Sequence, residues 1–225
     1  MEKFQNLEKT FKNHELLTRA LTHRSWVNEH PDHGETNERL EFLGDAILEF
    51  VVSQNLFDSF PDKEEGFLTA LRANLVNTVS LAKIAQKLNL GKLLYLSKGE
   101  EEGGGRENPT LLANTLEAVI GALYLDRGLT KVKLFITELI LTNIPQIISQ
   151  PLKDAKSRLQ ELVQAQGLNA PRYEVVQEKG PDHAKMFTVE VVVGSQVWGK
   201  GEGKSKSEAA QVAAQTILAK IERQG

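Results

Sequence analysis

The chain has 225 residues, room for one large or two modest domains, because a single hydrophobic core rarely grows beyond about 250 residues. Hydrophobic residues make up 40% and charged residues 25% of the sequence, which excludes a collagen-like, low-complexity or wholly disordered chain. The absence of cysteine excludes disulfides, a thiolate zinc site and a cysteine nucleophile.

No segment has the features of a membrane span or a secretion signal. The longest uncharged run, residues 139–152, contains two prolines and falls short of the roughly 20 residues that cross a bilayer. The N-terminal segment carries acids and bases at helical spacing in place of an apolar signal core. The sequence therefore predicts a cytoplasmic protein without a membrane partner.

Residues 1–148 predict an all-α domain, since their apolar residues recur at spacings of three and four without the alternation of strands. Two prolines and several polar residues favour a linker at 149–153. The first 150 residues hold 16 Lys and Arg against 21 Asp and Glu, and the remainder holds 11 against 9. Neither half is basic enough to bind nucleic acid by charge alone, so any RNA binding must depend on geometry.

Residues 154–225 predict a small α+β domain of order α-β-β-β-α. A helix over 154–166 is followed by three alternating segments at 173–177, 186–193 and 196–200, and a last helix covers 205–221. Gly194 and Ser195 favour a tight hairpin between the second and third strands. Ser205, with Glu208 three residues later, predicts a capping box at the start of the last helix.

Three carboxylates share one stripe of a predicted helix in the stretch NERLEFLGDAIL, residues 37–48. At 100° per residue, Glu38, Glu41 and Asp45 fall within an arc of about 60°, and the apolar residues lie on the other side. Such acids repel one another, and a hard cation would reverse the sign of their interaction. A solvated acidic face is the other interpretation of this spacing.

A second predicted helix, LLANTLEAVIGALYLD, carries Asn114 and Glu117 one turn apart. Its small residues, including Gly121, would let another helix approach closely. Two facing helices could then combine oxygen ligands of the kind that Mg²⁺ prefers, from Glu41, Asp45, Asn114 and Glu117. An asparagine that bridges two helices is the alternative.

These blocks resemble a known family. NERLEFLGDAIL, with ALTHRS before it and EEGFLTALRANLV and LANTLEAVIGALYLD after it, is similar to the bacterial ribonuclease III family of double-stranded-RNA endonucleases, over nearly the whole chain. The resemblance implies a homodimeric helical nuclease domain and a C-terminal double-stranded-RNA-binding domain. It also implies Mg²⁺-dependent hydrolysis (Mn²⁺ being a possible substitute) to 5′-phosphate and 3′-hydroxyl ends in the processing of ribosomal RNA precursors and mRNA, without a small-molecule substrate.

The resemblance assigns roles by position. It makes Glu41, Asp45 and Glu117 metal-binding catalytic acids, Glu38 the first acid of the block, Glu65 a further acid near the cut, and Phe42 an aromatic residue between subunits. The family usually has Asp where Asn114 stands, so an amide oxygen replaces a ligand carboxylate. One negative charge less should weaken the hold on the cation, and a chain that binds duplex RNA without cutting it is the rival function.

Three patches of the C-terminal domain resemble the contacts of double-stranded-RNA-binding domains, which read A-form shape across two minor grooves and the phosphates between them. The first helix offers amide and carboxylate groups, the loop between the first two strands a second contact, and the start of the last helix its basic end. The residues are Gln160, Glu161, Gln164, Pro181, His183, Lys204, Ser205 and Lys206. A structural ribosomal component is a third function that the sequence leaves open.

Overall fold

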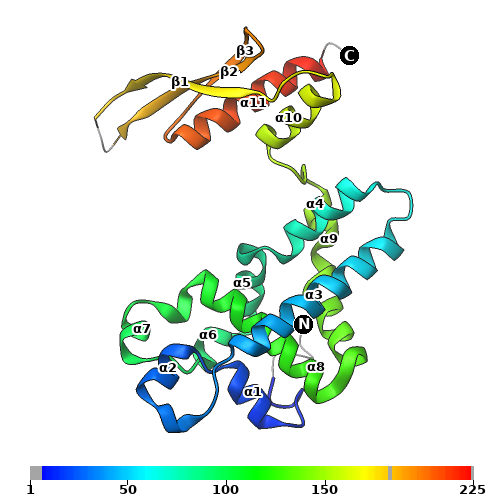
Figure 1. Ribbon diagram of the computed structural model, residues 1–225, viewed down its shortest axis with the longest axis vertical. Coiled ribbons are helices and arrows are strands. Elements are labelled where there is room, and N and C mark those ends of the chain that lie inside the picture. Colours follow the sequence, from blue (N-terminus) through cyan, green and yellow to red (C-terminus); the bar gives the residue numbers. More distant parts are fainter. Residues whose placement is uncertain (1–6, 182–183, 224–225) are drawn as a thin grey trace. The chain divides into compact units, whose positions relative to one another are not determined.

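The computed structural model describes residues 7–181 and 184–223, apart from the side chain of His33. The chain divides into two compact units, Met1–Leu152 and Lys153–Gly225, each of which is described by itself. The boundary falls inside the segment 149–153, the expected linker. Helices fill the described part of the first unit and an α-β-β-β-α arrangement forms the second, so the predicted fold class is confirmed (Figure 1).

The first unit is built from helices that surround a central pair. The pair consists of α3 (Glu38–Ser59) and α8 (Pro109–Leu139), which cross each other in close contact. Around them lie α1 (His14–Ala20), α2 (Arg24–Glu29), η2 (Pro31–His33), α4 (Glu65–Val76), α5 (Thr78–Lys87), α6 (Leu90–Leu93), α7 (Lys98–Glu102), η3 (Gly105–Glu107), η4 (Leu141–Asn143) and α9 (Ile144–Ile148).

Local sequence explains where α8 begins and bends. The side chain of Asn108 accepts hydrogen bonds from the N–H groups of Thr110 and Leu111, and Pro109 occupies the first turn, where its missing N–H costs nothing. Gly128 interrupts the helix with a φ of 74°, a conformation that only glycine adopts readily. Ten of the twelve residues from Leu112 to Leu123 are buried, so this part of α8 forms the axis of the core.

The second unit stacks two helices on one face of a three-stranded antiparallel sheet. The strands β1 (Arg172–Lys179), β2 (Met186–Val193) and β3 (Gln196–Gly203) follow the order β1-β2-β3. Helices α10 (Ala155–Ala165) and α11 (Lys206–Glu222) enclose a small aliphatic core with the sheet. A side chain at Gly201 would meet the backbone of α11, so the bare strand lets the helix approach the sheet.

One detail at the start of α11 differs from the sequence prediction. The hydroxyl of Ser205 accepts the N–H of Glu208 at 3.1 Å, as a capping box requires. The Glu208 carboxylate, however, accepts the N–H of Lys204 at 2.8 Å and not that of Ser205. The Glu208 side chain therefore holds the backbone of Lys204, which is itself one of the expected phosphate contacts.

No helix in the part of the chain that the structure describes is both long and apolar enough to cross a membrane.

Candidate active site and RNA interface

Two glycines bring α3 and α8 into backbone contact. A Cβ built at Gly44 would overlap the carbonyl oxygen of Glu117 and lie 2.9 Å from the nitrogen of Gly121. A Cβ at Gly121 would in turn overlap the carbonyl oxygen of Leu40. Because neither residue has a side chain, the helices cross closely enough to combine the acids of α3 with Asn114 and Glu117 of α8.

The electrostatics of the site show that these carboxylates interact. Burial, together with the negative charges of Asp45, Glu41 and Glu49, raises the pKa of Glu117 to about 7. Burial likewise raises the pKa of Glu41, with Glu38 and Asp45 adding to the rise. The side chain of Asn114 hydrogen-bonds to the Glu41 carboxylate and lowers its pKa, so this amide stabilises the charged form of Glu41.

A cavity of about 400 Å³ opens beside these residues. It is lined by Glu38, Glu41 and Asn114 on one side and by the start of α2 on the other, the full set being His23, Arg24, Asn37, Glu38, Glu41, Leu111 and Asn114. Arg24 Nη1 lies 3.5 Å from Glu38 Oε1, and both side chains are largely exposed. The positively charged guanidinium group of Arg24 therefore lies in the cavity next to Glu38, where it could pair with an incoming phosphate.

The residues fit a divalent cation by their chemistry. Among residues 7–181 and 184–223, no group of three or more acidic or histidine side chains has the arrangement of a ready-made metal site. Mutual repulsion of the carboxylates opposes such an arrangement, and a cation would offset it. The available donors are carboxylate and amide oxygens, which are hard ligands of the type that Mg²⁺ takes.

Glu65 lies elsewhere. It stands at the start of α4, its carboxylate accepts the hydroxyl of Thr69 at 2.6 Å, and it lines a second cavity with Phe50 and Phe57. Of the six expected site residues, Glu38, Glu41 and Asn114 line the first cavity, and the charges of Asp45 and Glu117 couple to Glu41 across the two helices. Glu65 neither lines that cavity nor shifts the pKa of Glu41 or Glu117, so it stands apart from the other five.

Phe42 lies on an exposed apolar face of α3. Its side chain is 81% exposed, and Phe50 and Phe57 are 53% and 71% exposed. At 100° per residue the three rings fall within an arc of about 80°, so they form one stripe, here called the α3 face. Single apolar residues are common on protein surfaces, but three exposed phenylalanines aligned in one stripe are not.

The expected contact residues of α10 are all exposed. Gln160, Glu161 and Gln164 lie on the outer side of the helix, whose inner side buries Leu159 and Val163. The ammonium group of Lys153 pairs with Glu161, so the first residue of this unit holds one of the three. This pairing places a positive charge on the same surface.

The start of α11 presents a second exposed group, made of Lys204, Ser205 and Lys206. Lys206 Nζ lies 3.1 Å from Glu178 Oε1 of β1 and 5.5 Å from the centre of the Phe187 ring. Sequence reasoning missed Glu178, and no spacing could have revealed it, since the two residues meet only through the folded sheet. Pro181 is exposed, and His183 lies outside the described residues.

The fold and the site together define a class: a helical nuclease-type domain with an acidic site, joined to a domain with the fold that binds double-stranded RNA. Residues 13–144 match the model of the Ribonuclease-III-like family, and residues 155–221 match the double-stranded RNA binding motif. The chain belongs to the ribonuclease III family, and the predicted class of endoribonuclease is confirmed.

Individual relatives agree with this assignment. Ribonuclease 3 of Geobacillus thermodenitrificans is 50% identical over 221 residues, which cover 96% of this chain and 90% of that protein. Ribonuclease 3 of Bacillus cytotoxicus is 49% identical over 221 residues, covering 98% of this chain and 90% of the relative. A structure of the nuclease domain of ribonuclease III from Campylobacter jejuni, which describes flexibility in a region involved in dimer formation, has 46% identity and a TM-score of 0.57, covering 63% of this chain and 96% of that one.

Proposed function

We propose that this chain is a Mg²⁺-dependent endonuclease that hydrolyses phosphodiester bonds of double-stranded RNA to 5′-phosphate and 3′-hydroxyl ends. The observation that carries the proposal is the electrostatic coupling of Glu41, Asp45 and Glu117 beside Asn114, across two helices in backbone contact. Residues 1–148 supply the catalytic domain, 149–153 the linker and 154–225 the RNA-binding domain.

The cation would be held by oxygens of Glu41, Asp45, Asn114 and Glu117, where Mn²⁺ can replace Mg²⁺. When bound, it supplies charge neutralisation at the phosphate and a more acidic water. Glu38 is paired with Arg24. A phosphate that enters the cavity would compete with Glu38 for that guanidinium, which then orients the phosphodiester against the acids.

The α3 face supports the proposal that the chain forms a homodimer. Two copies of Phe42, Phe50 and Phe57 packed together would remove apolar surface from water, which favours association by about 25 cal/mol per Å². Glu65 lines a cavity with two of these rings and so stands beside the proposed interface. This placement explains why Glu65 lies apart from the other acids. In the dimer it would stand near the scissile phosphodiester bond.

The second unit would bind the duplex by recognising its A-form geometry. Gln160, Glu161 and Gln164 would contact ribose hydroxyls in one minor groove, and the loop of Pro181 and His183 the next. Lys204, Ser205 and Lys206 would contact the phosphates between the grooves, where the N-terminus of α11 adds its partial positive charge. The setting we propose is cytoplasmic maturation of ribosomal RNA precursors and mRNA, with duplex RNA as the partner.

Asn114 decides between cleavage and binding alone. The decisive experiment resolves cleavage of an end-labelled RNA duplex on a gel, with Mg²⁺ or with EDTA, by the chain and by Asn114→Asp. We expect both to cut with Mg²⁺ only, and the aspartate variant to cut faster because it adds a ligand charge.

Two results would change the assignment. If only Asn114→Asp cuts while both proteins bind the duplex, the chain is a double-stranded-RNA-binding form of a nuclease scaffold. If neither cuts while both bind, the assigned acids are not the catalytic centre.

A further inference from the structure

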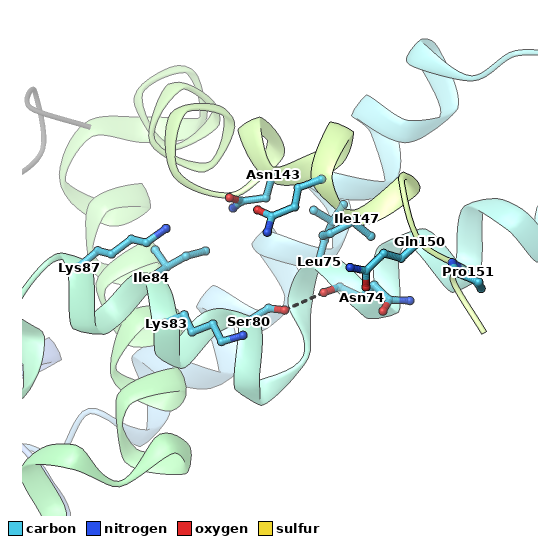
Figure 2. A pocket seen from close by; sticks show the side chains of 11 residues that line it. Asn74, Leu75, Ser80, Lys83, Ile84, Lys87, Asn143, Ile147, Gln150 and Pro151 are labelled. Carbon is cyan, nitrogen blue, oxygen red and sulfur yellow. Dashed lines mark hydrogen bonds between the residues drawn. The ribbon is translucent and has the colours of Figure 1, made fainter. Parts of the chain in front are cut away.

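A polar pocket of about 320 Å³ lies in the first unit between α4, α5 and the segment after α8 (Figure 2). Lys83 and Lys87 project from α5, and Asn143, Ile147 and Gln150 come from the later segment. We call it the α5 pocket; its lining residues are Asn74, Leu75, Ser80, Lys83, Ile84, Lys87, Asn143, Gln146, Ile147, Gln150 and Pro151. It shares no residue with the acidic cavity.

Hydrogen bonds hold the walls of the α5 pocket in place. The amide of Asn74 donates to the carbonyl oxygens of Ala70 and Leu152, both at 2.8 Å. Ser80 donates to the carbonyl oxygen of Asn74 at 2.8 Å, which ties α5 to α4 (Figure 2). The Asn143 amide donates to two carbonyl oxygens at the end of α8. The pocket is thus built before any ligand arrives, which lowers the cost of binding.

The charge of the α5 pocket is opposite to that of its domain. The first 150 residues carry five more acids than bases, yet no acidic residue is among the described side chains that line the pocket. Within the described chain, neither Lys83 nor Lys87 has an ion-pair partner, and the side chains of Gln146 and Gln150 have no hydrogen bond. Two ammonium groups and two amides are therefore available to a ligand.

We propose that the α5 pocket binds a nucleotide, free or within an RNA strand, through its phosphate. The two lysines stand one turn apart on α5 and would pair with the phosphate oxygens. The half-buried Ile147 supplies apolar surface for a base, with the buried Leu75 and Ile84 beneath it, and the glutamine amides can hydrogen-bond the edge of the base. The volume exceeds that of a single phosphate and lies at the lower end of small-molecule pockets. The proposal concerns a surface apart from the acidic site, so either can fail alone.

The test is calorimetric titration of the full chain, with EDTA present to prevent cleavage, using AMP and adenosine as probes. We expect AMP to bind and adenosine to bind at least roughly tenfold more weakly, since each charge-assisted hydrogen bond is worth about a factor of ten. The double variant Lys83→Glu/Lys87→Glu should lose AMP binding. Lys92→Glu, which changes an exposed lysine outside the pocket, should retain it.

Two further measurements show whether the natural ligand is a free nucleotide or one within RNA, and whether the variants fold. If the double variant also loses affinity for an RNA duplex, the natural occupant is a nucleotide within RNA; if duplex affinity is unchanged, it is a free nucleotide. Lys83→Gln/Lys87→Gln serves where charge reversal disturbs folding, as judged by circular dichroism. Equal binding of AMP and adenosine, no binding of AMP, or full AMP binding by a folded double variant would overturn the proposal.

Discussion

Gly44 of α3 and Gly121 of α8 face each other, and a Cβ at either position would lie within 3.0 Å of the other's backbone nitrogen. This contact sets the separation of the two helices that carry the acids. A methyl group added at either glycine would push the two helices apart, because the closely packed interior leaves no space for it. The same shift would move the acids of the site relative to one another.

Gly44→Ala should therefore be strongly destabilising. The added methyl would overlap the carbonyl oxygen of Glu117, and backbone cannot swing away as a flexible side chain can. We expect a loss of about 3 kcal/mol in the free energy of unfolding, measured with urea. Gly99→Ala is the matched control, since nothing lies within 4 Å of its Cβ, and it should be neutral or slightly stabilising. Equal stability of the two variants would contradict the packing described here.

Stability should depend on pH through Glu117. Burial and neighbouring charges raise its pKa in the folded state to about 7, from 4.5 in the unfolded chain. Between these values the folded state keeps a proton that the unfolded state has lost, so without metal the free energy of unfolding falls as pH rises through this window. Mg²⁺ should reverse much of the fall, because a bound cation favours the carboxylate.

Urea unfolding in EDTA and in Mg²⁺, at pH values from about 5 to about 8, measures this effect. Glu117→Gln should flatten the pH dependence, leaving the smaller part that arises from the raised pKa of Glu41. An unchanged slope in this variant would show that Glu117 titrates normally and is not coupled to the other acids.

Sequence periodicity was sufficient to predict the acidic stripe, because Glu41 and Asp45 lie one turn apart whatever surrounds the helix. The small residues around Gly121 likewise indicated a close helix contact. The partner of that contact, Gly44, could not be foreseen, since it depends on the crossing point of two helices far apart in sequence. The separate position of Glu65 depends on the same tertiary packing.

Affinity for RNA should be limited by Glu178. Its carboxylate lies 3.1 Å from Lys206 and 3.9 Å from Lys185, so a phosphate must compete with it for Lys206. Glu178→Gln should tighten duplex binding by roughly threefold to tenfold and make it more sensitive to salt. Fluorescence anisotropy at several salt concentrations measures both effects. Glu174→Gln on the same strand removes an equal charge beside Arg172 and should have less effect; an equal gain in both variants would indicate a general charge effect.

Phe42→Ala should separate assembly from folding. The ring is 81% exposed, so its removal should cost the isolated subunit well under about 1 kcal/mol, as for most surface substitutions. Loss of an aromatic anchor at the α3 face should weaken a dimer by about 2 kcal/mol or more, which raises its dissociation constant at least roughly thirtyfold. Sedimentation velocity over a range of protein concentrations measures the shift. Leu48→Ala, six residues further along the helix and fully buried, should instead lower the free energy of unfolding by about 2–5 kcal/mol. If Phe42→Ala left the oligomeric state unchanged, the α3 face would not be the site of self-association.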